Sequence, residues 1–194
     1  SHSEYKRDTL PFSQRFIHRL GVEGRAGYIF QTNPFLEYSN HQYKPMKNAY
    51  AGHLKYSFQL RPHTVADQAY IGAYQGIGVG YFNFGNPEEL GNPLAVYLFQ
   101  GGRIAQFSPR ISLNYEWNFG ASFGWKPYDD AVNPLNKMMG SKMNAYLNAD
   151  FFLDWRVTRE VDFTAGLSLT HFSNGNTKFP NAGLNAVGLR AGLT

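Results

Sequence analysis

The length of the chain, 194 residues, fits one domain, and its composition is rich in aromatic residues and glycine, with 13 Tyr, 16 Phe, 3 Trp and 20 Gly. The lack of cysteine excludes disulfides, thiolate metal sites and a cysteine nucleophile. No run of about 18 apolar residues is present, which excludes a spanning helix, and the net charge of +4 is too modest and too scattered to indicate nucleic-acid binding.

Alternation of apolar and polar residues with a period of two predicts eight β-strands. They span residues 20–31, 50–60, 69–84, 95–107, 110–125, 143–157, 161–173 and 185–193. The phase of the fourth strand slips near Gly101 and Gly102, where we expect a β-bulge. The fifth strand has the clearest pattern, because apolar residues from Ile111 to Trp125 share one parity. Such a strand is much longer than the five or so residues typical of globular proteins.

The connections between the predicted strands alternate between long and short. The long ones are residues 32–48, 85–94, 126–141 and 174–184, and the shorter ones are residues 61–68, 108–109 and 158–160. This asymmetry is typical of outer-membrane barrels, which have long external loops and short periplasmic turns. The sequence therefore predicts an all-β fold, an antiparallel up-and-down transmembrane β-barrel of about eight strands, with a polar, filled interior and an apolar exterior that faces lipid.

The polar parity of the predicted strands carries charges of both signs, which we expect to pair inside the barrel as buried charges must. These residues are Glu23, Arg25, Lys55, Glu116, Asp150, Asp154, Arg156, Asp162 and Arg190. The competing architecture is a soluble barrel with an apolar interior, which would have to enclose Trp117, Trp125 and Trp155. An eight-stranded barrel has no room for these rings, the many Phe and Tyr and a ligand, so the membrane barrel is favoured.

The seventh strand ends in two reactive polar residues. The apolar parity that starts at Val161 continues to His171 and Ser173, so both face lipid in the predicted barrel. Their Cα atoms would lie about 6–7 Å apart, which lets the imidazole act as a general base for a serine nucleophile. Asn185 shares the outward parity of the eighth strand and is expected beside His171. The alternative is an interfacial histidine next to an ordinary polar loop.

The stretch HFSNGNTKFPNAGLN resembles the signature of the lipid A 3-O-deacylase (PagL) family. The matching residues are His171, Phe172, Ser173, Asn174, Pro180, Asn181, Gly183 and Leu184. The resemblance implies an eight-stranded outer-membrane barrel that hydrolyses an ester-linked 3-hydroxyacyl chain of lipid A on its outer wall, with the His as base and the Ser as nucleophile. Residues 125–148 also resemble an acyloxyacyl hydrolase-like branch of this family seen in the Bacteroidetes.

One position departs from the signature, because Asn185 stands where the family has an acidic residue. An amide oxygen can hold the tautomer of an imidazole but cannot stabilise an imidazolium as a carboxylate does. Two functions therefore stay open. One is an outer-membrane serine esterase that removes a (3-hydroxy)acyl chain from lipid A, and the other is a non-catalytic barrel that is structural or binds lipopolysaccharide in a membrane complex.

For the esterase we expect Ser173 as nucleophile, His171 as base and Asn185 as the residue that orients the base. Candidate donors to the oxyanion are Asn174, Gly175, Asn176 and Asn181. Lysines in or beside the external loops are candidates for contact with lipid A phosphates, with a solvated rim as the alternative. They are Lys44, Lys47, Lys126, Lys137, Lys142 and Lys178. No metal or other cofactor is expected.

The expected location is the bacterial outer membrane, with a signal peptide already removed. Residues 1–19 are expected to form an N-terminal periplasmic segment and residues 20–194 the barrel. The expected partners are lipid A or lipopolysaccharide, outer-membrane lipid and other outer-membrane proteins, but no nucleic acid. Since the final LRAGLT has no terminal aromatic residue, eight strands would be a minimum if the chain is a fragment of a longer barrel.

Overall fold

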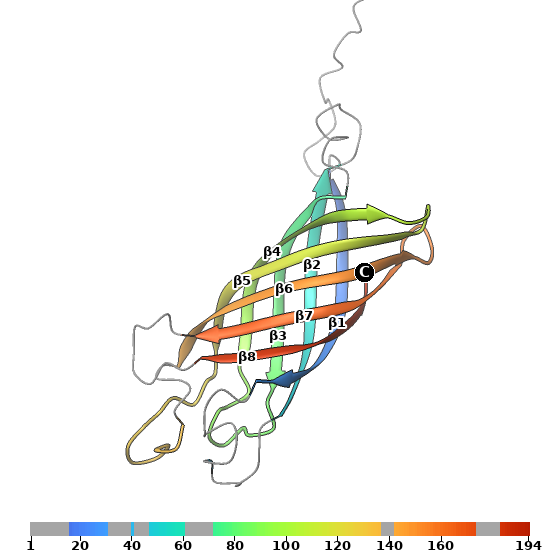
Figure 1. The fold of residues 1–194 in the computed structure, drawn as a ribbon. Helices are drawn as coiled ribbons and strands as arrows, with labels where there is room; N and C mark the ends of the chain where they lie inside the picture. The colour runs from blue at the N-terminus through green and yellow to red at the C-terminus, as the bar shows by residue number, and fades with distance from the viewer. Residues whose placement is uncertain (1–15, 31–39, 41–46, 61–71, 137–141, 174–182) are drawn as a thin grey trace, which may run out of the picture.

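In the described part of the computed structural model, eight antiparallel strands form a closed barrel in which neighbours along the chain are neighbours in space (Figure 1). The structure describes residues 16–30, 40, 47–60, 72–136, 142–173 and 183–194. The strands are β1 (Phe16–Ile29), β2 (Asn48–Leu60), β3 (Tyr74–Asn83), β4 (Leu94–Gln106), β5 (Ile111–Phe123), β6 (Met143–Arg156), β7 (Asp162–Ser173) and β8 (Leu184–Leu193). Pairing of β8 with β1 closes the barrel. Within these ranges, no helix is long and apolar enough to cross a membrane.

Alternate residues of each strand point into the barrel and away from it, as the period-two pattern predicts. On β5, Trp117 is 46% exposed whereas its neighbour Glu116 is 2% exposed. Large apolar side chains are exposed on all eight strands, among them Leu20, Leu54, Ile77, Leu98, Phe119, Phe151, Leu167 and Leu189. An apolar surface of this extent needs a non-aqueous environment. The apolar face of the strands is therefore the lipid-facing exterior, and the prediction of its orientation is confirmed.

The two ends of the barrel differ. The connections that follow β3 and β5 gather at the lower end in Figure 1, and this end, where β1, β3, β5 and β7 finish, is called the loop end. At the opposite end, called the turn end, residues 107–110 and 157–161 make short turns between β4 and β5 and between β6 and β7. Short turns at one end and longer loops at the other are the expected asymmetry of an outer-membrane barrel.

The predicted starts of two strands were wrong. β1 begins at Phe16, before the predicted start at Leu20, and β3 begins only at Tyr74, because Gly72 has a positive φ of 88° that interrupts the extended chain. The connection from β2 to β3 is therefore longer than the connection from β3 to β4, and the strict alternation of loop lengths fails there. The predicted N-terminal segment remains a prediction, since residues 1–15 lie outside the described ranges.

The bulge in β4 lies just beyond the predicted glycines. The register with β5 shifts between Arg103 and Ala105, which leaves Ile104 as the extra residue. Gly101 and Gly102 stay in register because they make room for tyrosines: a Cβ at Gly101 would lie 2.4 Å from the Tyr74 hydroxyl, and one at Gly102 would lie 3.1 Å from the Tyr115 ring. The glycines therefore serve packing and do not make the bulge.

Two side chains differ in burial from the prediction. Trp125 was expected to face lipid with the rest of β5, but it is only 3% exposed. Gly124 has a φ of 91°, which ends the alternation and turns Trp125 over the end of the barrel. There its indole Nε1 donates to Ser122 Oγ at 2.8 Å. Arg156, predicted to be inside, is exposed because it is the last residue of β6 at the turn end.

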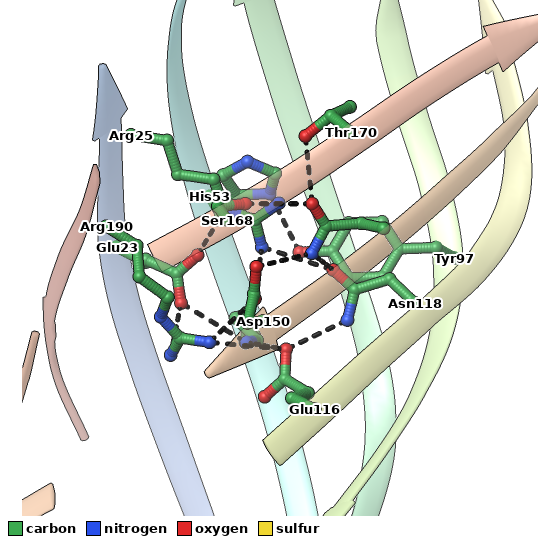
Figure 2. A network of polar contacts seen from close by, with 12 residues as sticks. Glu23, Arg25, His53, Tyr97, Glu116, Asn118, Asp150, Ser168, Thr170 and Arg190 are labelled. Carbon is green, nitrogen blue, oxygen red and sulfur yellow. Dashed lines mark hydrogen bonds and ion pairs between the residues drawn. The ribbon is translucent and has the colours of Figure 1, made fainter. Parts of the chain in front are cut away.

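The middle of the lumen holds a balanced network of buried charges (Figure 2). Its members among the described residues are Glu23, Glu116 and Asp150, with Arg25, Lys55 and Arg190. Lys55 Nζ lies 2.6 Å from Glu116 Oε2, and Arg190 lies 2.6 Å from Glu23 and 2.8 Å from Asp150. Each charge thus has an opposite partner, which compensates for its removal from water. The predicted pairing of interior charges is confirmed for these six residues.

Toward the loop end, the lumen changes from charged to aromatic. Phe82, Phe84, Trp125, Tyr146 and Phe172 form the centre of a buried apolar cluster. Beyond this cluster at the loop end, two asparagines join the loops that follow β3 and β5. Asn133 Nδ2 donates to the carbonyl oxygen of Glu89 at 2.7 Å, and Asn136 Nδ2 donates to the same oxygen at 3.2 Å. This packed end supports the strand ends that carry the predicted site.

Candidate active site

His171 and Ser173 lie at the loop end of β7 on the outer face of the barrel. Both are partly exposed, while Phe172 between them is completely buried. His171 pairs with Leu147 of β6 and with Asn185 of β8, and Ser173 pairs with Ala145. The period of two has therefore brought two reactive side chains to the lipid-facing wall with apolar neighbours on β6.

A hydrogen bond joins His171 to Asn185 across the two last strands. His171 Nδ1 lies 2.6 Å from Asn185 Oδ1. An amide oxygen can only accept, so this contact requires the proton on Nδ1 and leaves a lone pair on Nε2. An imidazole in this tautomer is a competent general base toward a hydroxyl group.

Phe172 anchors the end of β7 from inside. Its ring centroid lies 5.0 Å from those of Phe82 and Trp125 and 5.3 Å from that of Tyr146. Edge-to-face and tilted contacts at these distances are favourable and hold the ring in one orientation. Because successive side chains of a strand point to opposite faces, a fixed Phe172 keeps both His171 and Ser173 on the outer wall. Sequence reasoning treated Phe172 only as part of the motif.

The inner face of β7 is also tied to β6 directly behind the site. Thr170 Oγ1 donates to Asn148 Oδ1 at 2.8 Å, and Ser168 Oγ donates to the same oxygen at 2.9 Å (Figure 2). Thr170 and Phe172, the residues on either side of His171, are therefore both held by contacts inside the barrel. The alternation of polar residues on these strands suggested an inner face but not these pairings.

Gly183, which directly precedes β8, lies against His171 and Ser173. Its φ is 72°, a conformation that glycine adopts without strain. A Cβ added there would lie 3.2 Å from His171 Cε1 and 3.6 Å from Ser173 Cβ. Glycine at this position therefore leaves the space beside the imidazole open. Sequence reasoning noted Gly183 in the motif but assigned it no role, because neither φ nor cross-strand contact is visible in a pattern.

The wall around the site is apolar and aromatic. The backbone N–H of Phe30 donates to the carbonyl oxygen of Asn185 at 2.9 Å. Phe30, which follows β1, is therefore next to Asn185 on the side away from His171. Phe30 is exposed on this wall, and its ring meets that of Tyr28 edge-on at 6.3 Å. A molecule that reaches His171 along this surface therefore has to partition into the hydrocarbon region of the membrane or its interface.

The remaining predicted site residues are placed only in part. Lys47, Lys126 and Lys142 are exposed at the loop end, before β2, after β5 and before β6. The other residues predicted to contact the oxyanion or the headgroup lie outside the described residues: Lys44, Lys137, Asn174, Gly175, Asn176, Lys178 and Asn181. Within the described ranges, no group of three or more His, Asp or Glu side chains is arranged to hold a metal ion.

Comparison with known proteins identifies relatives of the whole barrel. The family described as lipid A 3-O-deacylase (PagL) matches residues 19–194. The solved structure of the outer membrane enzyme PagL is similar with a TM-score of 0.54 and 16% identity, covering 89% of this chain and 97% of that one. Neisserial surface protein A is similar with a TM-score of 0.55 and 11% identity, covering 92% and 94%. No curated protein matches the chain. At these identities, the solved structures support the fold alone.

Proposed function

Because the chain belongs to the lipid A 3-O-deacylase (PagL) family and is a barrel of the bacterial outer membrane, we propose that it is a serine esterase that removes an ester-linked (3-hydroxy)acyl chain from lipid A. The observation that carries the proposal is the hydrogen bond from His171 to Asn185 on the lipid-facing wall, next to Ser173. In this proposal the loop end faces the cell exterior, where the outer leaflet presents lipid A.

The proposed acylation step uses the lone pair on His171 Nε2. Ser173 Oγ attacks the ester carbonyl carbon while the imidazole takes the hydroxyl proton. The tetrahedral intermediate then collapses, the bond to the sugar oxygen breaks, and the imidazolium returns the proton to that oxygen. A water molecule hydrolyses the acyl-serine by the same transfers in reverse, which releases the 3-hydroxy fatty acid and restores Ser173.

Asn185 determines how well this base works. Its amide oxygen holds the imidazole ring and tautomer, but it lacks the negative charge with which a carboxylate stabilises the imidazolium. The apolar wall around the site strengthens any electrostatic contact that is made there. We therefore propose an active but slow enzyme, with Asn174, Gly175, Asn176 and Asn181 as candidate oxyanion donors and with Lys126, Lys142 and Lys178 as candidate contacts to lipid A phosphates.

Mass spectrometry of lipid A tests the proposal. Cells that express the wild type should lose one hydroxyacyl chain from lipid A, and cells that express Ser173→Ala should retain it. Ser108→Ala is the matched control, because Ser108 lies in the turn between β4 and β5 at the opposite end of the barrel, where its Oγ accepts from Ile111 N at 3.1 Å. Unchanged lipid A with a wild-type barrel that is folded in the outer membrane would contradict the esterase.

The substitution at residue 185 favours a second candidate, a relative without catalysis that serves as a structural or lipopolysaccharide-binding member of a membrane complex. The two candidates differ in their dependence on Ser173. A binding barrel should retain lipopolysaccharide equally well as wild type and as Ser173→Ala, and neither form should change the acyl chains of lipid A.

A further inference from the structure

A polar cavity of about 400 Å³ occupies the lumen between the charged network and the turn end. Among the described residues, six basic and three acidic side chains line it. They are Arg19, Lys55, Arg103, Arg110, Arg156 and Arg190, with Glu116, Asp154 and Asp162. Since the network in the middle of the lumen is balanced, the excess of positive charge comes from the arginines nearer the turn end. The cavity therefore attracts anions.

Buried polar atoms without hydrogen bonds are concentrated in this cavity. Thr164 Oγ1 and Arg190 Nε have no hydrogen-bond partner among the described residues, and Arg19 Nη1 and Asp162 Oδ1 form an ion pair with each other at 3.4 Å but no hydrogen bond. All four residues line the cavity. Thr164, Arg190 and Asp162 are only 2%, 4% and 6% exposed. Buried polar groups are nearly always paired, so four such atoms around one cavity indicate a ligand that pairs with them.

The four atoms come from one continuous part of the wall. Asp162 and Thr194 exchange two backbone hydrogen bonds, of 2.7 and 2.9 Å, where β7 meets the end of β8. Thr164 follows two residues later on β7 and faces the same side, and Arg19 Nη1 approaches Asp162 Oδ1 to 3.4 Å from β1. Arg190 lies on β8, with its Nη atoms already bonded to Glu23 and Asp150 and its Nε left over.

The donors and the acceptor define the chemistry of the ligand. Two guanidinium N–H groups and a hydroxyl group can donate to negatively charged oxygens, while Asp162 Oδ1, which has an ion pair with Arg19 but no hydrogen bond, can accept from a donor. A tetrahedral oxyanion that still carries one O–H group meets both requirements. We propose that this cavity binds a phosphate group, with Arg19, Arg190 and Thr164 donating to its oxygens and with Asp162 accepting from its O–H group.

The O–H group distinguishes possible ligands. Inorganic phosphate carries it at neutral pH and sulfate does not. A phosphate monoester carries it only below its second pKa of about 6. The cavity should therefore bind inorganic phosphate at pH 7.5 and discriminate against sulfate, and it should bind a monoester such as glycerol 3-phosphate more tightly at pH 5.5 than at pH 7.5.

Isothermal titration calorimetry on the whole barrel in detergent tests the proposal. Inorganic phosphate should bind at least about tenfold more tightly than sulfate, since an acceptor without a partner opposes sulfate. Arg19→Gln and Thr164→Val should each weaken phosphate binding about tenfold, and Asp162→Asn should remove the preference over sulfate. Binding of inorganic phosphate alone would identify the free ion as the ligand, and additional binding of glycerol 3-phosphate at pH 5.5 would extend the ligand to monoesters.

Arg159→Gln is the matched control, because Arg159 is exposed in the turn between β6 and β7 and does not line the cavity. It should leave the dissociation constant unchanged within a factor of two. Thr164→Val keeps the shape of the side chain and therefore tests the hydroxyl in a barrel whose folding is verified by circular dichroism. The proposal is overturned if the wild type gives no binding heat with phosphate, if sulfate binds equally well, or if Arg159→Gln weakens binding as much as Arg19→Gln.

Discussion

The charged network in the lumen and the His171–Asn185 pair on the outer wall differ in how completely their polar groups are paired. Glu23 in the lumen lies within ion-pair distance of Arg25, Lys55 and Arg190, so its charge is saturated by partners. On the outer wall, the hydrogen bond to Asn185 occupies one nitrogen of His171. Saturation stabilises the barrel, whereas a nitrogen left for a substrate permits chemistry. Polar groups of this barrel therefore contribute to stability where they are fully paired, and to the proposed function where one hydrogen-bonding atom is left for a substrate.

The largest effect is expected from removing the base. His171→Ala should lower the deacylation rate by about 10⁴-fold or more, as loss of a catalytic histidine does in serine hydrolases. Its thermal unfolding midpoint should stay close to that of the wild type, because the side chain lies on the outer wall. Rates from purified protein with lipid A in mixed micelles and melting followed by circular dichroism measure the two effects. A rate within tenfold of the wild type would contradict the role of His171.

Breaking the charged network in the lumen should instead lower the stability of the barrel. Glu23→Ala leaves three buried cations with fewer partners and should destabilise the barrel by about 3–5 kcal/mol. Unfolding in urea, in lipid vesicles, measures the loss. Glu160→Ala is a suitable control, since Glu160 is exposed in the turn between β6 and β7. Equal stability of the two variants would show that the network contributes nothing to folding.

Adding a negative charge beside His171 should raise the rate of deacylation. Asn185→Glu places a carboxylate beside the imidazole and should raise kcat by about 10- to 100-fold, because the imidazolium gains a counter-ion. Asn185→Ala should lower kcat, because the ring loses its orienting acceptor. Single-turnover rates of the three forms would rank the contributions. An unchanged rate in both variants would mean that residue 185 does not act on the base.

The smallest effect is expected at the glycine beside the pair. Gly183→Ala should lower kcat about tenfold, since the new methyl group would press against His171. Gly85→Ala is the matched control: Gly85 also has a positive φ, of 79°, but a Cβ there meets nothing within 4 Å. Both should cost about 1–2 kcal/mol of stability for the left-handed backbone. Equal activity of the two variants would show that the space beside His171 is unimportant.

The residue pattern by itself determined the architecture and the face on which the candidate site lies. Eight alternating stretches predict the strands, and the apolar parity that contains Leu167 also contains His171 and Ser173. These predictions succeed because the alternation of side chains along a strand is local and needs no knowledge of partners. The opposite parity placed Glu23 and Glu116 in the lumen for the same reason.

Only the tertiary structure decided which residues meet. The bulge at Ile104 lies beyond the two glycines, which instead make room for Tyr74 and Tyr115, and the burial of Trp125 depends on a single positive φ at Gly124. The contact of Gly183 with His171 and the convergence of Arg19, Thr164 and Arg190 on one cavity likewise join segments distant in sequence. Register and packing across strands set these contacts, and a pattern read along one strand contains neither.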